Sequence, residues 1–367
     1  SILRMAEMAR QSLGLPEDDQ VALVRAETLL DAHCPPFAVD HPAWVAGIAT
    51  PALAQASVNA LVGIYSHTHQ VRLVNVEHTG QHASLMLRDV PAWPLLSADT
   101  VMYLPSAGHG TSMEAFQEVI AHLRAPDGCP WDRKQTHASL RPYLLQETYE
   151  ALAALDAEDP QKMCEEFGDI LLQVVLHAQA AQEAGTFTLA GVLQTVHDKI
   201  VFRHPHVFGD AQVDGEGGVL VNWERLKAQE RAANGEPEKG MLDGVPTAMP
   251  ALVLAQEYQS RAARVGFDWS ELEPMLAKVY EELNEVAAAQ SDEQRAKELG
   301  DVLFAVVNVV RWYKVDAESA LRATNQRFKS RFQHVERRAR EVGKSLLDMK
   351  LEEMDVFWEE AKDLEGE

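Results

Sequence analysis

Two stretches of the chain combine apolar residues at helical spacing with a row of acidic residues. In the second stretch the apolar positions fall three or four residues apart, the spacing at which side chains share one face of an α-helix; they are Leu299, Val302, Leu303, Val306, Val307 and Val310. Residues 280–286 precede this row, and residues 145–150 with 166–172 repeat the arrangement upstream. The pattern predicts two helical hairpins.

The first 107 residues follow a different pattern of short apolar runs. Pro, Gly and Asn separate the runs, several of which are rich in Val or Ile, as is typical of strands. The runs are Val21–Val24, Trp44–Ile48, Val71–Val76 and Val101–Leu104. Helical stretches are expected around residues 4–14 and 51–65. We therefore predict a small α/β segment here.

Helical periodicity dominates the rest of the chain. We expect helices at 112–124, 138–156, 161–184, 189–202 and 221–232. Pro160 marks a turn between two of them, because proline is tolerated in the first turn of a helix and not in its interior. Residues 233–240 are polar and rich in Gly and Pro, which indicates a flexible linker.

These patterns predict a mainly α protein with an internal repeat. The expected domains are an α/β segment at 1–107, two tandem all-α helical domains at 112–234 and 249–367, and a linker at 235–248.

Five acidic residues of the second repeat are expected to converge. Glu281, Glu282 and Glu285 share one helical face, and Glu298 and Asp301 share a face of the next helix. Carboxylates this close repel one another unless a cation lies between them. Neither motif contains His or Cys, so the oxygen ligands favour Mg²⁺ or Mn²⁺ over zinc. The sequence predicts a metal-dependent phosphate chemistry.

The first repeat carries a similar acidic set with one change. Its carboxylates are Glu147, Glu150, Glu166 and Asp169, but Gln146 stands where the second repeat has Glu281. Losing one anion lowers affinity for a metal ion. Two interpretations remain open: a weakened or differently selective site, and a structural copy kept for packing and dimer formation. We expect reduced or absent activity in this repeat.

Further motifs recur in both repeats and resemble a known family. Lys199 and Arg203 correspond to Arg327 and Arg331, and Trp223 and Lys227 correspond to Trp358 and Lys362. Together with the acidic motifs and the runs Gly128–Asp132, Arg203–Phe208 and Val265–Trp269, residues 112–367 resemble the MazG family of tandem-domain nucleoside triphosphate pyrophosphohydrolases. The resemblance implies an all-α fold, a helix-swapped dimer, Mg²⁺ dependence and cleavage of NTPs or dNTPs to the monophosphate and pyrophosphate.

Roles follow for the remaining site residues. Arg327 and Arg331 are expected to hold the triphosphate, since guanidinium groups pair bidentately with phosphate oxygens. The resemblance implies that Trp358 packs against the base and that Lys362 contacts phosphate. The alternatives are a solvated basic face for the two arginines and a core or interface role for Trp358. We expect Trp269 in the core.

Alternative functions remain open at this level. The hairpin also resembles those of all-α dUTPases and phosphoribosyl-ATP pyrophosphohydrolases, which would narrow the substrate. A non-catalytic scaffold with structural metal is a further alternative. A homodimer is expected, and a pseudo-dimer of the two repeats within one chain is the alternative to it.

Composition narrows the partners. A formal net charge of −23 over 367 residues disfavours nucleic acid, which is bound by excess Lys and Arg. The sequence has no apolar run of about eighteen residues that could span a membrane, and no basic start followed by an apolar core, so we expect no signal peptide and a cytoplasmic location. Cys34, Cys129 and Cys164 lack Cys-x-x-Cys spacing and are expected to be free, buried thiols.

Residues 1–107 resemble the C-terminal half of a tetrapyrrole methylase domain. They lack the Gly-rich cofactor-binding loop of such a domain, so no methyl transfer is expected of them. An unrelated appended module is the alternative.

Overall fold

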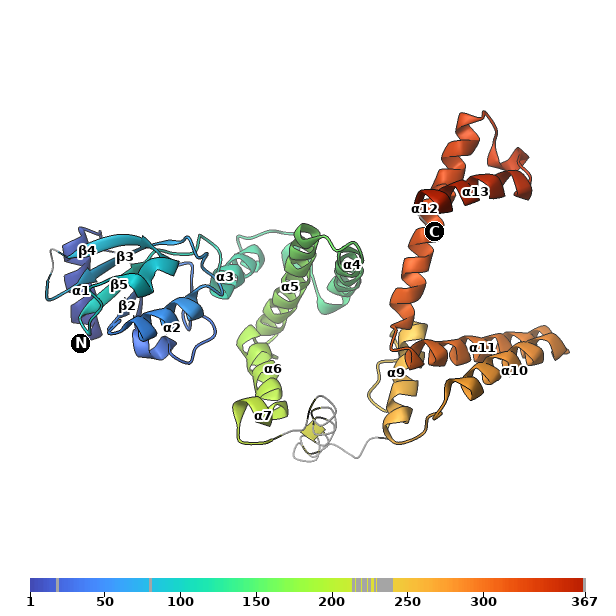
Figure 1. Ribbon diagram of the computed structural model, residues 1–367, viewed down its shortest axis with the longest axis horizontal. Helices are drawn as coiled ribbons and strands as arrows, with labels where there is room; N and C mark the ends of the chain where they lie inside the picture. The colour runs from blue at the N-terminus through green and yellow to red at the C-terminus, as the bar shows by residue number, and fades with distance from the viewer. Residues whose placement is uncertain are drawn as a thin grey trace. The chain divides into compact units, whose positions relative to one another are not determined.

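The computed structural model describes residues 1–17, 20–78, 81–212 and 240–365, together with single positions between 213 and 239 (Figure 1). The chain forms two compact units, Ser1–His197 and Asp198–Glu367. Most of the helix expected at 221–232, the boundary at 234 and residues 235–239 of the expected linker lie outside the described residues. The domain boundaries stay a prediction.

The described residues of the N-terminal segment form a five-stranded sheet. Its strands are β1 (Ala22–Arg25), β2 (Ala43–Ala46), β3 (Gln70–Asn75), β4 (His82–Met86) and β5 (Thr100–Leu104). The strand order is β1-β2-β5-β3-β4; β1 and β2 are parallel and the other pairs are antiparallel. Met102 of the central strand lies opposite both Val45 and Leu73, all three fully buried.

One helix covers each face of this sheet. Alternate residues of a strand point to opposite faces: Val45 packs in a core with α2 (Pro51–Leu61), and its neighbour Trp44 packs in a second core with α1 (Ile2–Leu13). The 3₁₀ helices η1 (Ala26–Leu29) and η2 (Leu87–Ala92) complete the segment. The prediction of a small α/β segment is confirmed (Figure 1).

Strand β4 was not expected from the sequence. It is an edge strand, and none of its residues is fully buried. An edge strand that is only half covered needs few apolar residues, and the run from His82 to Met86 therefore lacks the Val-rich character of the others.

Helices make up the remainder of the first unit. They are α3 (Met113–Arg124), η3 (Asp132–Lys134), α4 (His137–Asp156), α5 (Pro160–Glu183) and α6 (Leu189–Arg203), which crosses into the second unit and is followed by α7 (Pro205–Phe208). Pro160 occupies the first turn of α5, as the sequence predicted. The side chain of Asp159 caps this helix. Buried Ile120, Leu140 and Val175 join α3, α4 and α5 in one core.

Besides the end of α6 and α7, the described part of the second unit contains α9 (Ala251–Arg264), α10 (Leu272–Ala288), α11 (Asp292–Trp312), α12 (Ala317–Glu341), η4 (Leu346–Asp348) and α13 (Leu351–Glu365). Helices α10 and α11 form a hairpin, and α9 packs on α11. The Gln256 side chain joins α9 to the start of α12, accepting a hydrogen bond from Ala317 N at 2.8 Å. Near the other end of α12, Arg338 Nε lies 2.8 Å from Glu360 Oε2 of α13.

The structure also bears on the predictions for the cysteines and for membrane-spanning segments. Cys34 and Cys164 are free but exposed, so the prediction of buried thiols was wrong for both: Cys34 lies in an exposed bend, and Cys164 lies on the exposed face of α5. No helix in the described part of the chain combines the length and apolar character that a bilayer crossing requires.

Candidate functional site

The second hairpin brings three of the predicted carboxylates together. One oxygen from each of Glu282, Glu285 and Glu298 lies within 4.8 Å of the others. Glu282 and Glu285 come from α10, and Glu298 comes from α11, whose first turn is capped by the Ser291 side chain. Glu282 and Glu298 are each only 6% exposed, which is unusual for acidic residues without a compensating charge.

The electrostatics of this cluster suit a hard divalent cation. The neighbouring Glu282 carboxylate raises the pKa of Glu285, with burial and Glu298 adding to the effect. Among the described residues, no hydrogen-bond partner reaches the buried Oε2 of Glu298. A set of carboxylate oxygens that includes an unpaired one provides the ligands that Mg²⁺ prefers. The residues therefore fit the ion that their spacing predicts.

Two lysines flank the cluster. Lys278 Nζ lies 2.8 Å from Glu282 Oε1 and 2.9 Å from Glu281 Oε1, and these hydrogen bonds raise the pKa of Lys278. Lys297 Nζ lies 3.3 Å from Asp301 Oδ2 and 3.4 Å from Glu298 Oε1, with the same effect on its pKa. Lysine side chains thus neutralise part of the negative charge at both edges of the site.

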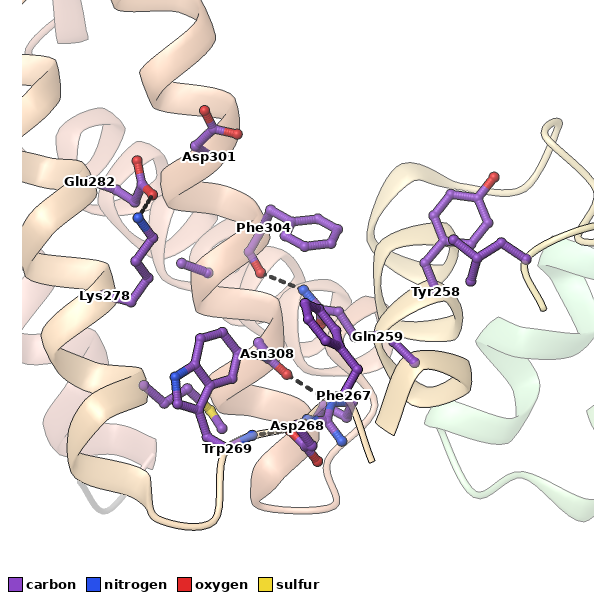
Figure 2. A pocket seen from close by; sticks show the side chains of 15 residues that line it. Tyr258, Gln259, Phe267, Asp268, Trp269, Lys278, Glu282, Asp301, Phe304 and Asn308 are labelled. Carbon is purple, nitrogen blue, oxygen red and sulfur yellow. Dashed lines mark hydrogen bonds and ion pairs between the residues drawn. The ribbon is translucent and has the colours of Figure 1, made fainter. Parts of the chain in front are cut away.

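The other two predicted carboxylates lie at the edge of the cluster. Glu281 is exposed and turns toward Lys278. Asp301 lines a cavity together with Glu282 (Figure 2). The sequence predicted all five carboxylates from their spacing alone. Spacing determines which helical face a side chain lies on, but it does not determine how close the carboxylate comes to those of the neighbouring helix.

The first repeat forms a matching cluster with different neighbours. Oxygens of Glu147, Glu150 and Glu166 gather within 4.8 Å of one another. The Gln146 amide donates to Glu150 Oε1 at 2.9 Å, where the second repeat has a carboxylate. Burial raises the pKa of Glu147, and the charges of Glu150, Asp169 and Glu166 add to this. Tyr143 occupies the position that corresponds to Lys278.

The predicted phosphate- and base-binding residues of the second repeat gather on α12 and α13. The guanidinium carbon of Arg331 lies 5.8 Å from the centre of the Trp358 ring, and Phe328 lies 5.3 Å from the same ring. Lys362 Nζ pairs with Glu359 at 3.0 Å, and Arg327 donates to Thr324 at 3.1 Å. Arg331 and Phe328 thus both contact Trp358, whereas the contacts of Arg327 and Lys362 are with neighbours on their own helices.

The corresponding residues of the first repeat lie on α6 and in the segment that follows it. Lys199 and Arg203 are on α6, and the Trp223 ring lies 5.9 Å from His204, just after that helix. Lys227 is partly buried.

A cavity of about 380 Å³ lies beside the second carboxylate cluster. Helices α9, α10 and α11 and the loop before α10 line it (Figure 2). Trp269 of that loop is 40% exposed, so the prediction that it belongs to the core was wrong: its ring forms a cavity wall. Gln259, Lys278 and Asn308 were missed. Lys278 had a signal, because it lies four residues before Glu282, whereas no motif in the sequence marked Gln259 or Asn308.

Several relatives of this chain are named nucleoside triphosphate pyrophosphohydrolases. The chain is 42% identical over 253 residues to the nucleoside triphosphate pyrophosphohydrolase/pyrophosphatase MazG of Thermotoga maritima, a match that covers 69% of this chain and 96% of the relative. This chain belongs to the MazG family. The MazG nucleotide pyrophosphohydrolase domain matches it twice, at residues 135–208 and 270–336, which confirms the internal repeat and the family resemblance.

Two other relatives show how far the similarity extends. The nucleoside triphosphate pyrophosphohydrolase of Escherichia coli K12 is 43% identical over 250 residues, 66% of this MazG chain and 94% of the relative. The uncharacterized protein YabN of Bacillus subtilis is 44% identical over 292 residues, 76% of this chain and 59% of its own length. Because the match to YabN covers 76% of this chain, it must include part of residues 1–107. Whether that segment is related to a methylase stays a prediction.

The two MazG domains contain both carboxylate clusters. The first matched range includes Glu147, Glu150 and Glu166, and the second includes Glu282, Glu285 and Glu298. Arg327 and Arg331 also lie in the second range, whereas Trp358 and Lys362 follow it.

Proposed function

We propose that this MazG protein hydrolyses nucleoside triphosphates, with ribose or deoxyribose, to the monophosphate and pyrophosphate. The observation that carries the proposal is the convergence of Glu282, Glu285 and Glu298 beside a cavity in a MazG domain. The names of the relatives from Thermotoga maritima and Escherichia coli support the same reaction. We assign the main site to the second repeat, because it has Glu281 where the first repeat has Gln146. It also has the ion pairs of Lys278 with Glu281 and Glu282.

The chain's own residues divide the work as follows. Glu282, Glu285, Glu298 and Asp301 would hold Mg²⁺, with Mn²⁺ as a substitute. When bound, the ion neutralises phosphate charge and acidifies water. We assign to Glu281, which is exposed at the rim, the orientation of a water molecule for attack on the α-phosphorus. Lys278 supplies a cation at the same rim for phosphate oxygens.

We further propose that a homodimer completes the site. Glu298 lies 14 residues before the end of α11, and Arg331 lies 14 residues after the start of α12. At about 1.5 Å per helical residue, each is roughly 20 Å from the corner between the two helices. A second copy can supply Arg327, Arg331, Trp358 and Lys362 from its α12 and α13.

The exposed apolar face of α11 supports this assembly. Leu299, Leu303 and Phe304 are each at least 47% exposed, and the first two belong to the apolar row that the sequence places on one face of this helix. Contiguous apolar surface of this kind marks an interaction site.

Two predictions from the sequence stay predictions: that the protein is located in the cytoplasm and that it does not bind nucleic acid.

The test is a panel of ribo- and deoxynucleoside triphosphates assayed with Mg²⁺ and with chelator, scoring pyrophosphate against orthophosphate. We expect Mg²⁺-dependent pyrophosphate release, abolished in Asp301→Asn and retained in the control Asp292→Asn, which alters an exposed carboxylate on the same helix. Turnover of dUTP or phosphoribosyl-ATP alone would favour a narrower enzyme. Absence of any Mg²⁺-dependent turnover would contradict the proposal and favour a scaffold.

A further inference from the structure

Helices α12 and α13 pack against each other along one row of α12 side chains (Figure 1). Arg331, His334 and Arg338 belong to this row, because residues three and four apart share one face of a helix. The Arg331 guanidinium lies over the Trp358 ring. His334 and Arg338 contact Glu360 instead. One end of the row therefore meets the expected base-binding side chain, and the other end holds the same helix in place.

The Glu360 carboxylate accepts hydrogen bonds from two side chains of α12. Arg338 Nε donates to Oε2 at 2.8 Å, and His334 Nε2 lies 3.4 Å from the same oxygen. Nδ1 of His334 accepts from Arg337 Nη2 at 2.7 Å, so the ring proton is on Nε2. The hydrogen bond from Arg338 lowers the pKa of Glu360, and that from His334 adds to the effect. The link between the two helices is therefore charge-assisted.

These polar groups lie where the two helices pack together. His334 is buried, and so is Ala361, the neighbour of Glu360 in sequence. The guanidinium carbon of Arg338 also lies 5.2 Å from the centre of the Phe357 ring. Phe357 and Glu360 are three residues apart and share one face of α13. Their contacts with Arg338 therefore fix the rotation of α13 about its own axis.

The rotation of α13 determines where its expected substrate-binding side chains point. Trp358 and Lys362 are four residues apart and share a face, and Glu360 lies midway between them in sequence. A helix rotates as a rigid unit, so a rotation that withdraws Glu360 also displaces the Trp358 ring from Phe328, 5.3 Å away. The placement of Trp358 and Lys362 thus depends on the contacts of Glu360.

We propose that Glu360 is a positioning residue, which holds Trp358 and Lys362 in the orientation that binds nucleotide. The inference rests on the proposed function, in which these two side chains contact the base and a phosphate. Glu360 acts through α13 and touches neither the substrate nor the metal ion. Loss of Glu360 should therefore weaken nucleotide binding and leave the chemical step at the carboxylates of α10 and α11 unchanged.

The test compares Glu360→Ala with the matched control Glu341→Ala. Both carboxylates pair with Arg338, and their side chains are similarly exposed, at 40% and 49%, but Glu341 is on α12 itself. With the best substrate of the nucleotide panel, Glu360→Ala should raise KM roughly 3- to 10-fold, the effect of one hydrogen bond, with kcat close to wild type. Glu341→Ala should leave both constants close to wild type. Glu360→Gln keeps the length of the side chain and an oxygen acceptor for Arg338, so its KM should rise less.

A second measurement is independent of turnover. The indole N–H signal of Trp358 in a ¹H–¹⁵N NMR spectrum is identified by its absence from Trp358→Phe. Glu360→Ala should lower the heteronuclear NOE of this signal, because the ring moves more freely on the ps–ns timescale once α13 is released. Glu341→Ala should keep the wild-type value. Melting by circular dichroism compares the folding of all variants.

Several results would overturn the proposal. An unchanged KM in Glu360→Ala is one, and a fall in kcat without a rise in KM is another, since Glu360 would then act on the chemical step. Equal rises in KM in Glu360→Ala and Glu341→Ala would assign the effect to the charge of Arg338. If no nucleotide is hydrolysed, the proposed function fails. An unchanged NOE of Trp358 in Glu360→Ala would then refute the positioning role by itself.

Discussion

Lys278 Nζ bridges two adjacent carboxylates of α10, at 2.8 Å from Glu282 and 2.9 Å from Glu281. A fixed cation beside a metal site repels the incoming ion and also attracts the substrate phosphates. We expect Lys278→Met to tighten Mg²⁺ binding by about 2- to 5-fold, the effect of one exposed charge pair, while the KM for nucleotide rises. Calorimetry with Mg²⁺ and steady-state kinetics measure the two effects. Weaker Mg²⁺ binding would instead show that Lys278 holds the carboxylates in position; Lys329→Met on α12 is the control.

The two repeats should respond differently to the same substitution. Glu282→Gln removes a ligand from the complete cluster and should lower pyrophosphate release by about 100-fold or more. Glu147→Gln alters the cluster that already contains Gln146 and should leave the rate close to wild type. Initial rates on one nucleotide at saturating Mg²⁺ decide the comparison. Equal losses would show that both repeats catalyse the reaction.

A site shared between two copies predicts complementation. Glu282→Gln and Arg331→Ala should each be inactive as homodimers. A mixed dimer contains one site with both defects and one site with neither, so mixing the two proteins should restore part of the activity. Exchange of subunits followed by an assay of pyrophosphate release measures this. No recovery, with exchange shown by a size-tagged subunit, would favour a site within one chain.

Stability without metal should depend on pH through Glu285. Its pKa is raised in the folded protein, chiefly by Glu282, so protonation favours the folded state. This contribution is present below the ordinary carboxyl pKa and is lost as pH rises through the raised pKa. We expect metal-free protein to melt at a higher temperature in mildly acidic buffer, relative to Glu285→Gln, and added Mg²⁺ to stabilise it most at neutral pH. Scanning calorimetry with and without chelator is the measurement. A Mg²⁺ effect independent of pH would place the ion elsewhere.

A structural ion pair in the first unit predicts a local loss of stability. Arg124 is almost fully buried and makes two hydrogen bonds to Glu183, at 2.9 and 2.8 Å, and these lower the pKa of Glu183. Because Glu183 is 40% exposed, we expect Glu183→Gln to lower the free energy of unfolding by about 1 kcal/mol. The difference should shrink as pH falls through the lowered pKa of Glu183. Urea unfolding compares it with Glu165→Gln, an exposed pair with Lys162 that should change little.

Much of the helical architecture was predictable from the sequence because it is encoded locally. Asp159 before Pro160 specifies the start of α5, and spacing of three and four places Glu282 and Glu285 on one face. The exposure of Trp269 and the positions of Gln259 and Asn308 in the cavity lining were not predictable, since they depend on which apolar faces meet. Strand β4 was missed for a similar reason: its pairing with β3 stabilises it more than its own composition does.

The hydrogen bond between Gln146 and Glu150 has a consequence for how far the first hairpin depends on a metal ion. An amide that donates to a carboxylate turns a repulsive neighbour into an attractive one, so the earlier hairpin can close in the absence of any ion. Chelation should therefore loosen the later hairpin first, which would show as faster amide exchange in α10 and α11 than in α4 and α5.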